Sequence, residues 1–335
     1  MLKEIEIQNF RCFEQIKISG FERVNLIGGK NNAGKTAFLE ALCLKIDPGI
    51  SSLAILKKLR RETSNTLEAM PDRAWDNLFY NKNKERNIVI ISKDDSDNTE
   101  HVNINLDINS IKSKIIVEFI KNEDSSTWSA SPISTSHLIR YDISFTEEGS
   151  IIPPFIMISG RELTEAYDRA RLNDKDSEVL KAFQVIDPAI ESVESFSIGE
   201  PTLYLRRKGE KRLPLSLFGD AMNRVAEIIL KLVNNQHKIL LIDEIENGIH
   251  YTSQREFWRV LFRLAVELDT QIFATTHSLE MLQEFAYVGL EQNQECSSAY
   301  FELAKKPKTN EIIGIRRDLE TLNYALEHQK GVRGE

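Results

Sequence analysis

The chain has 335 residues, of which 41% are hydrophobic and 28% are charged, and its formal net charge is −8. The negative balance excludes a uniformly basic nucleic-acid-binding surface, and no apolar run approaches the roughly 18 residues of a membrane span. Three widely scattered cysteines provide neither a disulfide framework nor metal-ligand spacing. We therefore expect a cytoplasmic protein without a membrane partner, built as one large domain with an elaboration or as two modest domains.

The N-terminus is predicted to form a β-hairpin followed by a buried strand. Residues 2–8 alternate apolar and polar side chains, and residues 16–18 repeat this pattern after a turn at residues 10–13. The apolar run at residues 24–27 predicts the buried strand. A glycine-containing loop then leads into a helix over about residues 36–44.

The loop between that strand and that helix matches the phosphate-binding pattern G-x-x-x-x-G-K-[ST]. Gly29 and Gly34 allow the backbone to turn so that its N–H groups converge on phosphate oxygens at the positive end of the helix dipole. Lys35 would reach the β and γ phosphates, and the Thr36 hydroxyl would ligate Mg²⁺. The competing interpretation is an ordinary glycine-rich turn. The residues expected to contact the nucleotide are Gly29, Asn31, Asn32, Ala33, Gly34, Lys35, Thr36 and Ala37.

The middle of the chain is predicted to contain an antiparallel sheet and then a helical segment. A second helix is expected at about residues 53–61. Apolar runs separated by polar loops indicate strands at residues 88–91, 102–106, 115–119 and 138–145. The pattern turns helical and charged over residues 162–183 and is broken at Ile186-Asp187-Pro188. Residues 203–205 and Leu213 then flank the turn of a predicted hairpin.

The last third has the strand, helix, strand order of a parallel sheet covered by helices. Residues 220–233 place apolar side chains on one helical face, and residues 239–242 and 272–275 are candidates for buried strands. The helix between these two strands is expected to begin at a capping box formed by Ser253 and Glu256.

Acidic residues and a histidine follow these two strands. Asp243 and Glu244 stand at the end of the first strand, the edge at which open α/β sheets bind ligands. Asp243 would hold Mg²⁺, while Glu244 would orient and deprotonate the attacking water. His277, after the second strand, would donate to the γ-phosphate. Taken singly, these residues also fit a solvated strand end and a structural histidine, but their order behind the phosphate-binding loop favours a catalytic site.

The spacing of the motifs favours ATP as the nucleotide. Asp243 lies 207 residues after Thr36, which is too far for a compact kinase or a Ras-like GTPase. Residues 81–84 (Asn-Lys-Asn-Lys) also lack the aspartate of a guanine-reading N-K-x-D motif.

Segments spread over nearly the whole chain carry further patterns: Asn9-Phe10-Arg11, Gly29 to Thr36, Ile186-Asp187-Pro188, Pro214-Leu215-Ser216 with Gly219-Asp220, Leu241 to His250 and Ala274 to Ser278. Together they resemble AAA-type ATPases of the OLD/RecF/SMC-like class. The resemblance implies an ABC-type head that forms a homodimer, and in some cases a higher oligomer, around ATP. Ser216, Gly219 and Asp220 of one subunit would face the nucleotide of the other, with Asn247 to His250 at the seam. Leu217 stands where the family usually has a small residue, so backbone N–H groups near Gly219 would replace a serine contact.

The predicted fold class is α/β, a P-loop NTPase of the ABC-ATPase head type with a mixed central sheet, an antiparallel β subdomain and a small helical lobe. Residues 1–335 are expected to form a single head. Its parts would be residues 1–48 (N-terminal sheet and phosphate-binding loop), 49–150 (helical and antiparallel β insert), 151–213 (helical lobe and hairpin) and 214–335 (signature-like segment, acidic motif, histidine and C-terminal elements).

The resemblance also implies a biological role. Residues 162–183 are too few for the coiled coils of SMC-like proteins, and the segment after His277 is too short for the TOPRIM nuclease domain of OLD proteins. An isolated ATPase head would act through a separately encoded effector, a nuclease or a toxin, in a bacterial anti-phage or toxin-like module.

Two other functions are weighed against this one. The first is a RecF-like DNA-binding ATPase of DNA repair, whose candidate nucleic-acid surface is residues 206–212, with five basic residues and one acidic residue. A solvated, charged hairpin tip is the simpler interpretation of that run. The second is the motor subunit of a transporter, which the antiparallel insert does not suit. The acidic cluster at residues 94–97 is expected to be a solvated loop.

Overall fold

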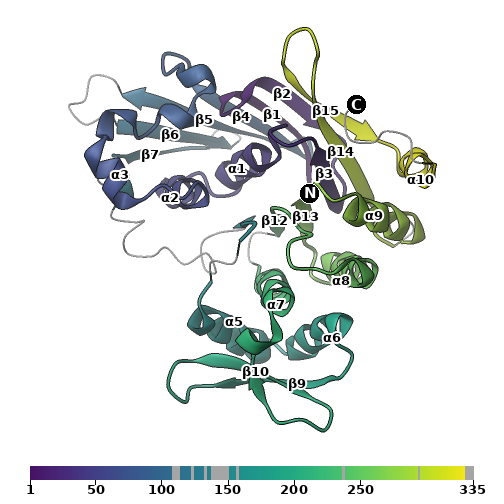
Figure 1. Ribbon diagram of the computed structural model, residues 1–335. Coiled ribbons are helices and arrows are strands. Elements are labelled where there is room, and N and C mark those ends of the chain that lie inside the picture. Colours follow the sequence, from purple (N-terminus) through teal and green to yellow (C-terminus); the bar gives the residue numbers. More distant parts are fainter. Residues whose placement is uncertain are drawn as a thin grey trace.

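The computed structural model describes residues 1–107, 114–121, 124–131, 134–136, 151–155, 158–235, 238–292 and 295–328. These residues form an upper lobe with two six-stranded sheets and a lower lobe with helices and a three-stranded sheet (Figure 1). The strand predicted at residues 138–145 lies outside the described residues.

The central sheet has the strand order β15-β14-β3-β13-β12-β8, in which all neighbours are parallel except β15 and β14. Buried-strand predictions at β3, β12 and β13 are confirmed. β13 is buried along its whole length, as expected for a parallel sheet that is covered on both faces. The strands of this sheet are β3 (Val24–Gly29), β8 (Ile151–Ile152), β12 (Ile239–Ile242), β13 (Gln271–Thr275), β14 (Ser298–Lys305) and β15 (Ile312–Arg317).

A second, antiparallel sheet has the strand order β2-β1-β4-β5-β6-β7. The predicted N-terminal hairpin is confirmed, with Ile7 opposite Ile16. The strands predicted within residues 88–119 belong to the same sheet, because Ile7 of β1 also pairs with Ile90 of β4. The hairpin and the antiparallel insert therefore form one layer. Its strands are β1 (Leu2–Phe10), β2 (Phe13–Ser19), β4 (Ile88–Asp94), β5 (Thr99–Asp107), β6 (Lys114–Lys121) and β7 (Asp124–Ala130).

Helix α1 (Lys35–Ile46) lies between these two sheets and contacts strands of both (Figure 1). Residues 37–44 are buried without interruption, so this helix has no solvent-facing stripe. Phe21 packs edge-on against Phe273 and Phe301, with ring centroids 5.1 Å apart in both pairs, and also contacts the ring of Phe38 in α1. This packing fixes the helix that begins with Lys35 and Thr36. The helices α2 (Ile50–Leu59) and α3 (Ser64–Ala69) follow it.

The lower lobe combines three helices with a small antiparallel sheet. The predicted helical segment at residues 162–183 is divided into two helices, and the first opens with a capping box between Ser159 and Glu162. The helix predicted at residues 220–233 is confirmed and packs against the other two. The predicted hairpin is also present, but its first strand pairs in addition with a strand that sequence patterns did not predict. These elements are α5 (Gly160–Leu172), α6 (Asp176–Ile186), α7 (Asp220–Val233), β9 (Ile190–Phe196), β10 (Thr202–Arg207) and β11 (Leu213–Pro214).

The helices α8 (Gln254–Glu267), α9 (Leu279–Glu291) and α10 (Leu319–Glu327) complete the fold, with α9 packed on β3 and the other two packed on α9. The capping box predicted at Ser253 and Glu256 is wrong. Ser253 ends a short 3₁₀ turn, and its backbone is already near-helical at φ −99° and ψ −8°. Its side chain therefore makes no cap hydrogen bond, because an N-cap needs an extended backbone.

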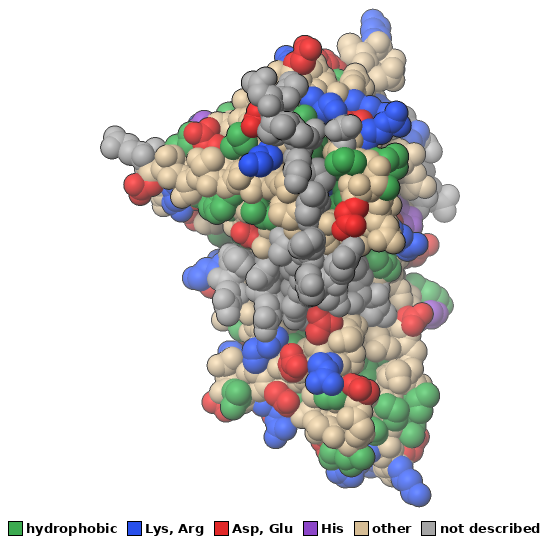
Figure 2. All heavy atoms as spheres, turned by 90° about the vertical axis from the view of Figure 1, so that its left-hand side faces the viewer, with side chains coloured by type: hydrophobic (Ala, Val, Ile, Leu, Met, Phe, Trp, Pro, Cys, Tyr) green, Lys and Arg blue, Asp and Glu red, His purple; other side chains and the backbone are tan. Residues whose placement is uncertain are grey.

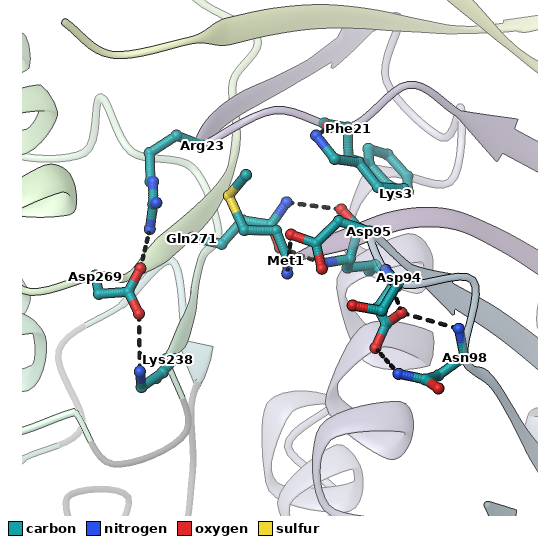
Figure 3. Close-up of polar contacts among 12 residues, drawn as sticks. Met1, Lys3, Phe21, Arg23, Asp94, Asp95, Asn98, Lys238, Asp269 and Gln271 are labelled. Atoms are coloured by element: carbon teal, nitrogen blue, oxygen red, sulfur yellow. Dashed lines mark hydrogen bonds and ion pairs between the residues drawn. The ribbon is translucent and has the colours of Figure 1, made fainter. Parts of the chain in front are cut away.

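Polar contacts join the N-terminal strand to the central sheet (Figure 3). The side chain of Gln271, at the start of β13, accepts a hydrogen bond from the Leu2 N–H at 2.9 Å. Its amide group donates to the carbonyl oxygens of Leu2, at 2.9 Å, and Glu22, at 2.8 Å. The amino group of Met1 pairs with Asp95 at 3.0 Å. One glutamine side chain thus connects β13 of the central sheet to β1 of the antiparallel sheet.

Charged groups just before the starts of β3, β12 and β13 are paired as well. Lys238 and Arg23 both donate to the carboxylate of Asp269 at 2.8 Å, and these hydrogen bonds lower the pKa of Asp269 to about 2 (Figure 3). In the acidic cluster at residues 94–97, Asp94 accepts hydrogen bonds from the backbone N–H groups of Ser96 and Asn98. The cluster is therefore a turn stabilised by its own side chain.

Replacing Gln271 by alanine should destabilise the fold without changing the other end of β13, where Thr275 lies. The change leaves buried polar groups of Leu2 unpartnered, so we expect the free energy of unfolding to fall by about 2–4 kcal/mol in urea titrations. The matched control is Gln292→Ala at the end of α9, for which a change within about 0.5 kcal/mol is expected. Equal stability of the two variants would show that Gln271 does not anchor the N-terminus.

Candidate active site

The phosphate-binding loop has the strained backbone that its glycines permit. Gly34 has φ +95°, and a Cβ atom there would lie 2.9 Å from the side chains of Cys12 and Phe13. Gly29 has φ +136°, and a Cβ atom there would lie 2.4 Å from the carbonyl oxygen of Leu303. Side chains at these two positions would both clash and strain the turn. The loop therefore keeps its N–H groups close around the start of α1.

Lys35 is folded back onto this loop. Its Nζ donates to the carbonyl oxygens of Gly29, at 2.9 Å, and Lys30, at 3.2 Å. Burial lowers the pKa of Lys35, and the nearby carboxylates of Asp243, Glu246 and Glu244 oppose that shift. The ammonium group therefore sits among neutral carbonyls, from which a more strongly charged acceptor such as a phosphate would draw it.

Thr36 and Asp243 meet although 207 residues separate them along the chain. The Thr36 hydroxyl donates to Oδ2 of Asp243 at 2.8 Å, and Thr275, at the end of β13, donates to Oδ1 at 2.5 Å. Only 2% of Asp243 is exposed, and this burial raises its pKa while the two hydroxyl groups act in the opposite direction. The first turn of α1 and the ends of β12 and β13 thus supply one cluster of hard oxygen atoms.

Glu244 stands next to this cluster in an unusual backbone conformation, at φ +47°. Its N–H donates to the Thr275 hydroxyl at 2.9 Å, and its Oε2 accepts from the side-chain amide of Asn247 at 2.8 Å. Asn247 also donates to the carbonyl oxygen of Pro154. The Glu244 carboxylate is 37% exposed, so water reaches it while the loop holds it in place.

His277 points toward two carboxylates, one of which sequence reasoning missed. Its Nδ1 lies 2.9 Å from Oε1 of Glu246 and 3.9 Å from Oε1 of Glu244. The Glu246 carboxylate also accepts the backbone N–H of His277 at 2.9 Å. The alternation of glutamates at residues 244 and 246 was a visible signal, but it does not specify a contact with a loop 31 residues away.

One cavity of about 920 Å³ joins these groups, a volume that suits a nucleoside triphosphate. Most of the predicted loop residues, the acidic motif and the histidine line it, together with residues from the turn between β1 and β2 and from the segment after α2. The lining residues are Arg11, Cys12, Asn31, Asn32, Gly34, Lys35, Thr36, Ala37, Arg60, Glu62, Asn77, Asp243, Glu244 and His277. Gly29 and Ala33 belong to the loop without lining the cavity.

The predicted residues of the signature-like segment lie elsewhere. Ser216, Gly219 and Asp220 are exposed at the start of α7 and do not line the cavity, and neither does Asn247. Asn247 is nevertheless followed by Gly248, where a Cβ atom would lie 3.4 Å from the backbone of Asp220 and Ala221. The turn after Glu244 therefore packs closely against the start of α7.

Sequence reasoning also missed a buried ion cluster beside the cavity. Glu40 is completely buried, one helical turn after Thr36, and accepts hydrogen bonds from Arg11 at 2.9 Å and Arg60 at 2.7 Å. Two arginines around one carboxylate leave a net positive charge at the cavity wall. The Asn-Phe-Arg motif pointed to Arg11, whereas no local pattern indicates that Arg60 would join it.

The oxygen cluster fits a magnesium ion bound with a nucleotide. Mg²⁺ prefers hard oxygen ligands and usually takes one or two from the protein, with the remainder from phosphates and water. The Thr36 hydroxyl and the Asp243 carboxylate provide such a pair. Among the described residues, no cluster of three or more His, Cys, Asp or Glu side chains offers a metal site made of protein ligands alone.

Comparison with protein families places these motifs in a known group. A family profile described as "AAA domain, putative AbiEii toxin, Type IV TA system" matches residues 24–282, from β3 into α9. The chain belongs to this AAA-domain family. This family member is accordingly an ATPase of the ABC/AAA class. In the described part of the chain, no helix is both long and apolar enough to cross a bilayer.

Two other proteins are similar to this chain in sequence. This AAA-domain protein is 24% identical to an "ATP/GTP phosphatase" of Helicobacter pylori over 386 aligned positions, which cover 100% of both chains. It is 31% identical over 143 residues to an uncharacterized protein of Methanocaldococcus jannaschii, across 42% of this chain and 62% of that protein.

Solved structures identify the fold of this family member. An SMC head domain from Thermotoga maritima superposes with a TM-score of 0.50 at 12% identity, covering 95% of this chain and 99% of that one. An Smc head domain bound to a ScpA domain derived from Pyrococcus furiosus gives a TM-score of 0.51 at 12% identity, with coverage of 98% and 99%. The predicted fold class, a P-loop NTPase of the ABC-ATPase head type, is confirmed.

Thr36→Val should weaken nucleotide binding only when magnesium is present. Valine keeps the shape of threonine but loses the hydroxyl, so we expect about a tenfold loss of affinity for ATP with Mg²⁺ in calorimetric titrations. Thr36→Ser keeps the hydroxyl and should stay close to the parent protein. An equal loss with EDTA in place of Mg²⁺ would show that the hydroxyl does not act through the metal.

Proposed function

We propose that this protein binds ATP with Mg²⁺, hydrolyses it, and uses the cycle to dimerise and to control a separately encoded effector. The observation that carries the catalytic part is the 2.8 Å hydrogen bond between Thr36 and Asp243, which joins the phosphate-binding loop to the acidic motif. Glu244 and His277 line the same cavity. These are the groups that phosphoryl transfer to water requires.

Each side chain has a defined task in this proposal. The loop N–H groups hold the phosphates, and Lys35 exchanges the carbonyls of Gly29 and Lys30 for β- and γ-phosphate oxygens. Mg²⁺, held by Thr36 and Asp243, would neutralise negative charge on the phosphates. Glu244, fixed by Asn247, orients a water molecule and accepts its proton. His277, whose Nδ1 lies 3.9 Å from the Glu244 carboxylate, donates to the γ-phosphate.

Dimerisation would complete the site. Within one chain, the cavity lacks contributions from Ser216, Gly219 and Asp220, which are exposed at the start of α7. Leu217, beside them, is 68% exposed, and Tyr251, near the turn after Glu244, is 64% exposed. Exposed apolar side chains next to functional segments support a surface that a second copy covers when ATP is bound.

Control of an effector is the biological part of the proposal. The matched family description names a toxin and a type IV toxin–antitoxin system, which supports a role in a bacterial anti-phage or toxin-like module. The ATPase would then act as a sensor or scaffold for a nuclease or toxin encoded separately. Its three cysteines are all free, as expected for a protein that works in the reducing cytoplasm.

The charge pattern of the lower lobe favours this function over RecF-like DNA binding. In the basic run at residues 206–212, Arg206 pairs with Glu191 at 3.4 Å, Arg207 with Asp187 at 2.5 Å, and Arg212 with Glu194 at 2.7 Å. On the face drawn in Figure 2, acidic and basic side chains are intermixed over this lobe. A surface compensated in this way attracts phosphates weakly.

Two substitutions should separate binding from hydrolysis. Lys35→Ala should abolish ATP binding in calorimetry, because the triphosphate loses its cation. Glu244→Gln should keep ATP bound but lower phosphate release by at least about 100-fold, because only the proton acceptor is lost. The same variant should accumulate as a dimer with ATP in light scattering.

The control for these variants is Glu311→Gln on the exposed turn between β14 and β15, which should hydrolyse ATP at the parental rate. Full activity of Glu244→Gln would exclude Glu244 as the base. A Lys35→Ala variant that still hydrolyses ATP would exclude the whole site.

The DNA-binding alternative has its own test. We expect the Arg206/Arg207/Lys211 triple alanine variant to bind DNA as weakly as the parent protein in fluorescence anisotropy, with the same salt dependence, because two of these three side chains already serve carboxylates. A clear loss of affinity, with a flatter salt dependence, would favour the RecF-like function instead.

A further inference from the structure

Glu246 is a buried carboxylate to which the proposed chemistry assigns no task. Its side chain is only 10% exposed. Its Oε1 accepts the backbone N–H of His277 at 2.9 Å and lies 2.9 Å from the ring Nδ1 of the same residue. Its Oε2 is buried and has no hydrogen-bond partner among the described residues. A half-satisfied buried carboxylate strongly favours a donor that stays close.

We infer that Glu246 is a positioning residue, which holds His277 in the orientation needed for phosphate binding and keeps it away from Glu244. The inference rests on the proposed ATPase function and deepens it. Two carboxylates compete for one ring nitrogen, at 2.9 Å for Glu246 and 3.9 Å for Glu244. The nearer one is the more buried, and hydrogen bonds to a charged group are stronger where water is excluded.

The consequence for the histidine concerns its second nitrogen. With Nδ1 facing Glu246, the ring presents Nε2 on its other side, and His277 lines the cavity together with Lys35 and Glu244. The hydrogen bond made by one ring nitrogen sets the protonation and direction of the other.

The consequence for Glu244 is that its carboxylate stays available to water. Its Oε2 is occupied by the amide of Asn247, so Oε1 is the atom left to accept a proton. Without Glu246, a small rotation of the His277 ring would bring Nδ1 from 3.9 Å into hydrogen-bond distance of that oxygen. The proposed base and the proposed phosphate donor would then bind each other.

Removal of the Glu246 side chain should leave the loop folded. The backbone is held separately, because the Ile249 N–H donates to the Glu246 carbonyl and the Ile245 N–H donates to the Thr275 carbonyl, both at 3.0 Å. Ile245 is fully buried and anchors the turn. A catalytic effect of Glu246→Ala can therefore be separated from unfolding by a thermal-unfolding control.

A double-mutant cycle on ATP hydrolysis tests this inference. We expect Glu246→Ala to lower kcat by about 10- to 100-fold, the range for losing the outer partner of a functional histidine, with ATP affinity nearly unchanged. Combining it with His277→Ala should add no further loss, because Glu246 acts through that ring. Glu246→Gln keeps an acceptor oxygen and should recover most of the rate. Glu256→Ala, an exposed glutamate on α8, is the matched control.

A spectroscopic measurement makes the test independent of hydrolysis. In ¹⁵N spectra at a pH where the ring is neutral, His277, assigned by its loss in His277→Ala, should carry its proton on Nδ1 and lose that preference in Glu246→Ala. The inference would be overturned if the losses of kcat in Glu246→Ala and His277→Ala multiplied in the double variant, or if the parent protein carried the Nε2–H tautomer. In that case, loss of ATP binding in Lys35→Ala would still support the proposed function. If the parent protein does not hydrolyse ATP, the proposed function fails, and the tautomer alone decides the role of Glu246.

Discussion

The hydrogen bond between Thr36 and Asp243 is the contact on which the proposed chemistry depends. Thr275 ends β13, Asp243 follows β12, and Thr36 stands in the first turn of α1, to which the loop after β3 leads. These three strands are adjacent and parallel, so their carboxyl ends bring the three residues together. Only a parallel sheet places consecutive strand ends together in this way. The long segment between β3 and β12 supplies β4 to β7 of the antiparallel layer and the whole lower lobe without disturbing the cluster.

The lower lobe is tied to this cluster by buried charges on α7. Arg224, 2% exposed, donates to the carbonyl oxygens of Asp243 at 2.8 Å and Pro153 at 2.5 Å. One turn further along, Glu227 pairs with Arg224, and then Lys231 donates to the carbonyl oxygen of Ile151 at 3.0 Å. Burial lowers the pKa of Lys231 to about 8. Helix α7, whose N-cap is Gly219, is thus hydrogen-bonded to the backbone at the end of β12. Binding of a partner at the exposed start of α7 would therefore act on the acidic motif through this helix.

Local sequence patterns predicted the parts of this molecule whose structure depends on local forces. The alternation around Ile7, the apolar runs of β3, β12 and β13, and the amphipathic face of α7 were sufficient, because burial of one face or of a whole strand leaves a period in the sequence. The phosphate-binding loop was also predictable, because its backbone conformation accepts few residue types.

The remaining features depend on contacts that no local pattern records. β9 was missed because its two buried residues, Ile190 and Val193, stand three positions apart, so its sequence lacks the period of two that marks a strand. The pairing of β1 with β4 and the partners of Glu40 and Glu246 arise from tertiary packing over long sequence separations. The error at Ser253 shows the reverse case, in which a neighbouring 3₁₀ turn overrides a valid local motif.

Anomalous diffraction from crystals grown with Mn²⁺ and a non-hydrolysable ATP analogue tests the central claim most directly. We expect a manganese peak about 2 Å from Oγ1 of Thr36 and beside the Asp243 carboxylate, with the phosphates in the glycine loop. A metal and triphosphate bound away from these two residues, with their hydrogen bond intact, would contradict the account.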